Sequence, residues 1–278
     1  MDYITPKPST KPSPSQQAQI DRKYGMFIHF GINTFNDTEW SDGKLSVSSY
    51  NPPEIDADGW VRNAYESGMN YVILITKHHD GFCLFDTKYT DYGVNHSQNK
   101  MDVVLEVSKA CKKYGVKLGL YYSLWDRHEK CYEDDEKYVE YMCGQLTELL
   151  GGKYGEVCEV WFDGGWDKTP DRWNIPKLYD LVHRLQPNSV SAVNVTIGYK
   201  WSKKSLRKFL PSKYKERVCL LGIFLVILGY GTLTLQERTI QNFIATTVNF
   251  TICRLRQPFV FVICATGFGI QNTRKIYW

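Results

Sequence analysis

Strand-like and helix-like patterns alternate along the first two thirds of the chain. Short runs rich in β-branched and aromatic residues predict strands at 25–30, 71–76, 117–123, 157–162 and 189–195. Apolar residues at helical spacing predict helices at 60–67, 102–114, 132–150 and 176–185. This alternation is typical of βαβ units around a parallel sheet. Because about five units are recognisable, the sequence predicts an α/β fold of the (β/α)8 TIM-barrel type that is incomplete.

Both ends of the chain depart from this pattern. Residues 1–20 are rich in Pro and Ser, which predicts a mobile leader. After residue 197 the alternation stops, and basic stretches and scattered apolar blocks follow. We therefore expect a leader at 1–20, a partial barrel with the active site at 21–197 and an atypical tail at 198–278. One hypothesis for the tail is that the reading frame or the gene model changes near residue 198.

The charge distribution changes at the same place. Residues 1–199 carry 21 Lys and Arg against 28 Asp and Glu, whereas residues 200–278 carry 13 against only Glu216 and Glu237. Such a basic tail often indicates a nucleic-acid or membrane partner. The break in pattern favours the altered-frame hypothesis instead, so we expect no nucleic-acid partner. The apolar run 218–230 is shorter than the roughly 18 residues of a membrane span. A membrane anchor that extends to Leu235 is the least favoured alternative.

The overall composition fits a globular protein with a sizeable core, and it leaves the cellular compartment open. The 19 Tyr and 8 Trp suit a sugar-binding cleft, although large cores use aromatic residues as well. None of the eight cysteines forms a Cys-x-x-Cys pair, so we expect buried free thiols rather than a zinc ribbon. Residues 1–19 lack an apolar h-region, so we expect no signal peptide there.

Asp163 is the most informative single position. It follows a buried, β-prone run, and Gly164 and Gly165 behind it leave room for a ligand. In a parallel barrel the carboxyl ends of the strands face the active site. Trp161 lies two residues earlier, so both side chains should point into the barrel. The alternative interpretation is a turn residue in a common Asp-Gly step.

Polar and aromatic residues also follow the earlier strands. His29 ends the first strand, Tyr121 lies in the third, and His78 and His79 end the second. Adjacent side chains in an extended strand point to opposite sides, which argues against a joint metal site for the two histidines. Hydrogen bonding to a polyhydroxylated ligand is the better interpretation, and a structural role for the histidines is the alternative. A carboxylate and an indole beneath a sugar suit glycoside cleavage, because its transition state carries oxocarbenium charge.

These segments resemble the alpha-L-fucosidase family of glycoside hydrolases. The resemblance rests on residues 23–31, Glu39-Trp40, 71–82, 118–123 and 159–164, in the order of the family, and covers about residues 20–197. It implies a (β/α)-barrel catalytic domain and retaining hydrolysis of terminal alpha-L-fucose from oligosaccharides or glycoconjugates, with Asp163 as the nucleophile. It also implies that no metal or organic cofactor is needed. The implied fucose pocket consists of His29, Glu39, Trp40, His78, His79, Tyr121 and Trp161.

The chain also departs from the family. A retaining glycosidase needs a second carboxyl group about 5–5.5 Å from the nucleophile. The family's acid/base lies beyond the fifth strand, where the resemblance ends, and neither Glu216 nor Glu237 has a matching context. Glu39 is a partial substitute at best. The alternative hypothesis is therefore an inactive, truncated relative that binds fucose or folds poorly, because an open five-stranded barrel exposes a strand edge.

Overall fold

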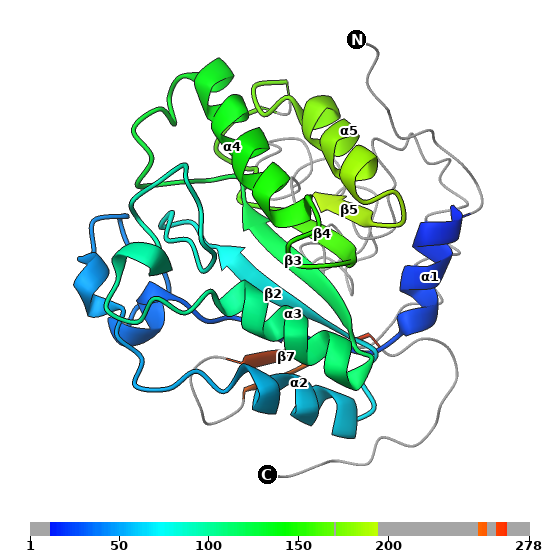
Figure 1. Cartoon of the computed structure of the whole chain (residues 1–278). Helices are drawn as coiled ribbons and strands as arrows, with labels where there is room; N and C mark the ends of the chain where they lie inside the picture. The colour runs from blue at the N-terminus through cyan, green and yellow to red at the C-terminus, as the bar shows by residue number, and fades with distance from the viewer. Residues whose placement is uncertain (1–11, 170, 194–249, 255–259, 266–278) are drawn as a thin grey trace, which may run out of the picture.

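Five parallel strands form the centre of the structure, which is a computed structural model that describes residues 12–169, 171–193, 250–254 and 260–265 (Figure 1). Each strand pairs with the next one along the chain. These strands lie in the part of the chain for which the sequence predicts a barrel. The parallel strands are β1 Gly25–Ile28, β2 Tyr71–Lys77, β3 Lys117–Ser123, β4 Val157–Asp163 and β5 Val190–Val193. The predicted α/β class with a parallel sheet is confirmed.

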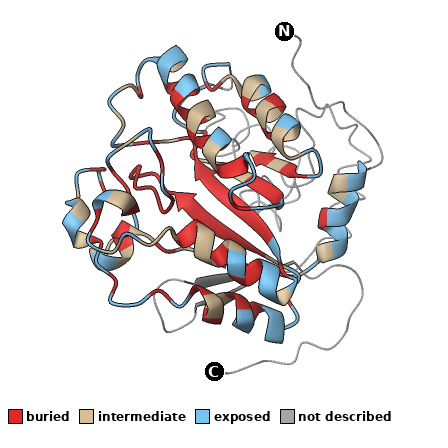
Figure 2. Cartoon of the chain, in the orientation of Figure 1, coloured by how far each residue is buried: buried red, intermediate tan, exposed pale blue. Residues whose placement is uncertain are grey.

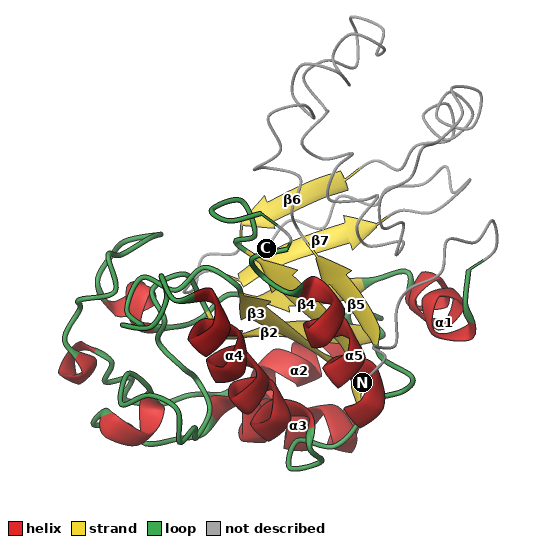
Figure 3. Cartoon of the chain, turned by 90° about the horizontal axis from the view of Figure 1, so that it is seen from above, coloured by secondary structure: helices red, strands yellow, loops and turns green. Residues whose placement is uncertain are grey.

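A helix connects each parallel strand to the next, and Figure 3 shows these helices on one face of the sheet. They are α2 Ala57–Glu66, α3 Val103–Tyr114, α4 Asp135–Leu150 and α5 Ile175–Leu185. Short 3-10 helices interrupt the loops at η1 Ile32–Phe35, η2 Val47–Ser49 and η3 Val94–His96. The opposite face of the sheet is therefore the one on which a barrel interior would form.

Local sequence signals set the helix ends. The side chains of Asp56, Asp102 and Asp134 accept hydrogen bonds from backbone N–H groups in the first turns of α2, α3 and α4. These bonds satisfy donors that have no partner within a helix. Gly115 ends α3 in the left-handed conformation, with φ of 71°, which a glycine adopts without strain.

The central strands are largely buried (Figure 2), and the two faces of the sheet pack into different clusters. Val72, Leu74 and Val160 belong to the large core beneath the helices. Ile73 and Ile75 instead form a smaller cluster on the opposite face. Because both faces are buried, β2 is apolar along nearly its whole length rather than alternating.

The tail adds two strands to the sheet. The strand β7 Val260–Ala265 pairs antiparallel with β1, and β6 Phe250–Arg254 pairs with β7, which gives the order β5-β4-β3-β2-β1-β7-β6. The expected open five-stranded sheet is thus wrong on the β1 side, because a strand from the tail occupies that edge. Residues 194–249, with Glu216, Glu237 and the apolar run at 218–230, lie outside the described residues.

Part of the expected mobile leader is a helix. The helix α1 Pro14–Arg22 begins with a capping box, in which Ser13 Oγ accepts from Gln16 N–H and Gln16 Oε1 accepts from Ser13 N–H. Its end is attached to the sheet, since Asn70 Nδ2 donates to the Arg22 carbonyl over 2.9 Å. The Pro and Ser content predicted a mobile leader, but Pro and Ser are also common at the first positions of a helix, so composition alone did not indicate α1. Within the described residues, no helix is both long and apolar enough to span a bilayer.

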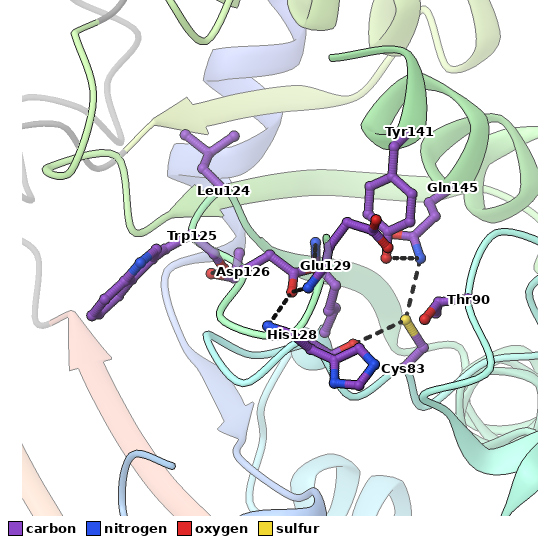
Figure 4. A network of polar contacts seen from close by, with 12 residues as sticks. Cys83, Thr90, Leu124, Trp125, Asp126, His128, Glu129, Tyr141 and Gln145 are labelled. Carbon is purple, nitrogen blue, oxygen red and sulfur yellow. Dashed lines mark hydrogen bonds and ion pairs between the residues drawn. The ribbon is translucent and has the colours of Figure 1, made fainter. Parts of the chain in front are cut away.

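A buried ion pair joins β2 to the loop after β3. Lys77 Nζ lies 2.9 Å from Asp126 Oδ2, and both side chains are buried. Asp126 Oδ1 also accepts from the backbone N–H groups of His128 and Glu129. Figure 4 shows this carboxylate turned toward that backbone, near the buried contact between Gln145 and Cys83. Asp126 therefore fixes the loop as well as balancing the lysine charge.

Replacing Lys77 by Met should destabilise the fold by about 3–5 kcal/mol, because it leaves the Asp126 carboxylate buried and without its counter-charge. The double variant Lys77→Met/Asp126→Asn should lose less, since it removes both charges and keeps an acceptor for the loop. Urea unfolding measures both. The matched control is Lys117→Met, which breaks the exposed pair with Glu156 and should cost at most about 1 kcal/mol. Equal losses for Lys77→Met and Lys117→Met would contradict the role of the buried pair.

Candidate active site

Asp163 lies at the carboxyl end of β4, where Tyr121 of β3 holds it. The Tyr121 hydroxyl donates to Asp163 Oδ2 over 2.9 Å. The register places Tyr121 beside Trp161 and Ser123 beside Asp163, so these four residues share one face of two adjacent strands. A hydrogen bond of 2.6 Å from Leu124 N–H to the Asp163 carbonyl joins the ends of the two strands. Asp163 is thus part of an ordered contact between two strands rather than a residue of an isolated turn.

The Tyr121 hydroxyl stays protonated when it meets the carboxylate. Burial, and then the negative charge of Asp163, raise the pKa of Tyr121 well above its ordinary value. The Tyr121 ring packs edge-on against the Phe27 ring, and the Phe27 ring also contacts Trp161 edge-on. These rings form an apolar base under the carboxylate on the face opposite the helices.

The three predicted histidines lie in a row of contacting rings. The ring centroids of His78 and His79 are 4.2 Å apart, and those of His29 and His78 are 4.7 Å apart. The expectation that His78 and His79 point to opposite sides is wrong. The strand ends at Lys77, so the alternation of an extended strand no longer applies to the two residues after it.

The two outer histidines are neutral near pH 7. Burial, and then the neighbouring His78, lower the pKa of His29 to about 3 and that of His79 to about 2. His79 Nε2 lies 3.9 Å from Asp163 Oδ2, a distance at which a charged ring would form an ion pair. Because the ring is neutral, this contact places an imidazole nitrogen and a carboxylate oxygen next to each other without an ion pair.

Ser123 determines which nitrogen of His79 carries the proton. The Ser123 hydroxyl donates to the Trp125 carbonyl over 2.6 Å, so its single hydrogen is already used. Ser123 Oγ must then accept from His79 Nδ1, which lies 2.7 Å away. The neutral ring therefore keeps a lone pair on Nε2, on the side of Asp163. His79 Nε2 and Asp163 together form a pair of acceptors suited to the hydroxyl groups of a ligand.

The loop after β1 brings Trp40 to the site, whereas the Glu39 side chain is exposed. The Trp40 ring lies edge-on to His79, with centroids 5.3 Å apart, and is 48% exposed. The Glu39 side chain is exposed, and only its backbone carbonyl is fixed, by Asn33 Nδ2 over 3.3 Å. In the described part of the chain, the Glu39 carboxylate makes no hydrogen bond or ion pair. The structure therefore brings seven of the eight predicted site residues into one chain of contacts, and Glu39 is the one that does not join it.

Sequence reasoning missed three residues that surround His79. Ser123 fixes its tautomer, and Trp125 and Trp166 pack against its ring at 5.5 and 5.2 Å. Position could have identified Ser123, because it lies two residues after Tyr121 and so shares its face. Trp166 follows the two glycines behind Asp163, but the sequence alone does not show that their backbone turns the indole back toward the site.

The described residues contain no group of three His, Cys, Asp or Glu side chains that could hold a metal ion. The contacts of Asp163 given above come from a hydroxyl and a neutral imidazole, which are hydrogen-bonding partners rather than further acids. Glu216 and Glu237 are not among the described residues. Asp80, whose Oδ2 lies 3.8 Å from His78 Nδ1, adds a second buried carboxylate to the cluster. Carboxylates among aromatic rings and neutral imidazoles suit a carbohydrate ligand.

Comparisons with known proteins agree on one family. The family model for Alpha-L-fucosidase matches residues 36–217. Alpha-L-fucosidase 1 of Arabidopsis thaliana is 45% identical over 198 residues, which cover 68% of this chain and 39% of that protein. The chain thus spans about two fifths of the length of this relative.

Solved structures of the same family have a similar fold. A glycoside hydrolase 29 family member from an unknown rumen bacterium matches with a TM-score of 0.61 and 36% identity, over 65% of this chain and 35% of that one. The alpha-L-fucosidase AlfC of Lactobacillus casei, in complex with alpha-L-fucose product, matches with a TM-score of 0.56 and 25% identity. The match covers 64% of this chain and 70% of that one.

The neutral histidines predict how stability depends on pH. The folded-state pKa of His79 lies below that of an unfolded histidine, about 6.5, so between the two values only the unfolded chain binds the proton. Stability from His79 is therefore complete above about pH 6.5 and is lost as the pH falls. The slope approaches about 1.4 kcal/mol per pH unit.

The variant His79→Gln removes this proton site and should lose less stability than the wild type between pH 7 and pH 4. Urea unfolding at several pH values measures the difference. Titrating groups that do not interact with His79 cancel in the comparison. Glu159, whose pKa burial raises to about 7 and which acts in the opposite direction, is one of them. Parallel stability curves for the two proteins would show that His79 is not held neutral.

Proposed function

Because the chain belongs to the alpha-L-fucosidase family, we propose that it binds terminal alpha-L-fucose and cleaves its glycosidic bond with retention of configuration. The single observation that supports this most is the environment of Asp163. Its carboxylate lies at a strand end, is held by the Tyr121 hydroxyl and faces the lone pair of His79 Nε2. The substrates in this proposal are fucosylated oligosaccharides or glycoconjugates, and no cofactor takes part.

In this proposal Asp163 attacks the anomeric carbon of fucose. The bond from that carbon to the leaving-group oxygen breaks, a glycosyl ester to Asp163 forms, and water later cleaves the ester. Tyr121 is a positioning residue, since its hydrogen bond to Oδ2 orients the Asp163 carboxylate. His29, His78, His79, Trp40 and Trp161 would surround the sugar, with the neutral histidines accepting or donating to its hydroxyl groups.

We further propose that the five parallel strands belong to a (β/α)8 catalytic barrel, with residues 21–197 as the part recognisable here. The helices on one face and the aromatic base on the other support this arrangement. The general acid/base would lie outside the described residues, since the resemblance to the family places it beyond the fifth strand. A substrate whose leaving group needs no proton can therefore test the nucleophile separately from the acid/base.

Alpha-L-fucosyl fluoride is such a substrate, since fluoride departs without protonation. The wild-type chain should release fluoride, and Asp163→Asn should reduce the rate at least about a thousandfold, because the amide is not a nucleophile for this step. A fluoride electrode measures both rates. The matched control is Asp91→Asn, an exposed aspartate paired with His96 on the surface, which should leave the rate unchanged.

Two outcomes would contradict the proposal. A rate that survives Asp163→Asn would assign the attack to another group. A folded wild-type protein that releases no fluoride would favour the alternative of an inactive relative of the family.

A further inference from the structure

Asp80 is a buried carboxylate that the proposed reaction does not use. It lies in the turn after β2 and is 2% exposed. Both of its oxygens accept hydrogen bonds: Oδ1 accepts from Phe82 N–H over 2.7 Å, and Oδ2 accepts from Asn33 Nδ2 over 2.8 Å. The carboxylate therefore has a fixed place beside the His78 ring, whose Nδ1 is 3.8 Å from Oδ2.

His78 is the central ring of the histidine row. It contacts the rings of both His29 and His79. It also lies nearly parallel to the Tyr121 ring, with an interplanar angle of 25° and centroids 6.0 Å apart. His78 thus lies among the groups that surround Asp163, and the nitrogen that carries its proton determines what the pocket offers to a ligand.

The position of Asp80 determines which nitrogen of His78 is protonated. Within the described residues, His78 Nδ1 is buried and makes no hydrogen bond. At 3.8 Å, Asp80 Oδ2 is beyond hydrogen-bond distance and acts on Nδ1 through its charge. A carboxylate attracts a ring N–H and repels a nitrogen lone pair. The proton is therefore favoured on Nδ1, and Nε2, the nitrogen farther from Asp80, keeps the lone pair.

Asp80 also connects its turn to the loop that carries Trp40. Asn33 Nδ2 donates one hydrogen to Asp80 and the other to the Glu39 carbonyl, over 3.3 Å, next to Trp40. Asn33 belongs to η1, so the same amide joins the segments that follow β1 and β2. The carboxylate therefore fixes the place of two parts of the pocket.

The backbone of the turn sets the distance between Asp80 and His78. Gly81 N–H donates to the His78 carbonyl over 3.1 Å, which closes the turn. Gly81 has φ of 90°, and a Cβ atom at this position would collide with the Asp126 carboxylate. A turn fixed in this manner keeps Asp80 beside the ring without the entropic cost of ordering a mobile loop.

We propose that Asp80 is a positioning residue that holds the proton on His78 Nδ1, so that His78 Nε2 accepts a hydrogen bond from a hydroxyl group of fucose. The inference rests on the proposed function, since it concerns the same pocket. His79 has the same arrangement, because Ser123 Oγ accepts from its Nδ1. Two histidines then present acceptors next to the Asp163 carboxylate, and such a pocket selects a ligand that brings donor hydroxyl groups.

Nitrogen NMR of the full chain, labelled with 15N only in its six histidines, tests the position of the proton. The protonated and the unprotonated nitrogen of a neutral imidazole differ clearly in chemical shift, and His78→Gln identifies the signals of His78. On the high-pH plateau of the titration, the wild type should carry the His78 proton on Nδ1. Asp80→Asn keeps an acceptor for Phe82 N–H but exchanges the other carboxylate oxygen for an amide N–H. Most of the His78 proton should then move to Nε2.

Fluoride release from alpha-L-fucosyl fluoride tests the role toward the sugar. Asp80→Asn should raise KM about tenfold and change kcat less than about threefold. The reason is that a hydrogen bond from a fucose hydroxyl to His78 is made in the bound substrate as well as in the transition state.

Two further variants separate positioning from general damage. Asn33→Ala removes a donor to Asp80 but leaves the carboxylate beside His78, so it should lower stability against urea and keep the proton on Nδ1. Asp91→Asn removes the exposed carboxylate 3.3 Å from His96, so it should shift only the His96 signals and leave KM unchanged.

A His78 proton on Nε2 in the wild type, or one that stays on Nδ1 in Asp80→Asn, would overturn the proposal. An unchanged KM in folded Asp80→Asn would also overturn it, because Asp80 would then have only a structural role. If the folded wild type releases no fluoride, the proposed function itself fails and the role toward fucose fails with it, while the NMR result still decides whether Asp80 sets the proton of His78.

Discussion

The parallel register between β3 and β4 is the constraint on which the site depends. It sets Tyr121 beside Trp161 and Ser123 beside Asp163, so one pair forms the aromatic base and the other forms the polar layer above it. A slip of β4 by one residue would turn Trp161 and Asp163 toward the helices and away from Tyr121 and Ser123. The hydrogen bond from Leu124 N–H to the Asp163 carbonyl and the glycine at 164 hold the strand ends at this register.

Burial then determines the electrostatics of the pocket. His29 and His79 lie against other rings with little water, so they remain neutral, and the carboxylate is not neutralised by an imidazolium. Ser123 leaves the acceptor lone pair of His79 on the side of Asp163. Neutral imidazoles beside the Asp163 carboxylate can bind sugar hydroxyl groups while the carboxylate keeps its charge for attack.

Most of the fold could be predicted from sequence, because β2 to β4 and α3 to α5 have strong periodic patterns and clear capping residues. Their predicted bounds agree with the structure to within about three residues, as is usual for helix and strand ends. The helix α1 was missed because a composition rich in Pro and Ser outweighed its capping box. The facing of His78 and His79 was wrong because the strand ends at Lys77, so the alternation of side chains does not extend to them. Trp125 and Trp166 were missed because their contacts depend on how loops from distant strands turn, whereas the position of Ser123 in β3 could have identified it.

The proposed function depends on Asp163 as the group that forms a covalent bond to fucose. The most direct measurement is mass spectrometry of the protein after incubation with 2-deoxy-2-fluoro-alpha-L-fucosyl fluoride, whose fluorine at C2 slows breakdown of the glycosyl ester. The account predicts one added deoxyfluorofucosyl group per chain, located by peptide sequencing on Asp163. Folded protein with no added mass, or with the label on another residue, would contradict it.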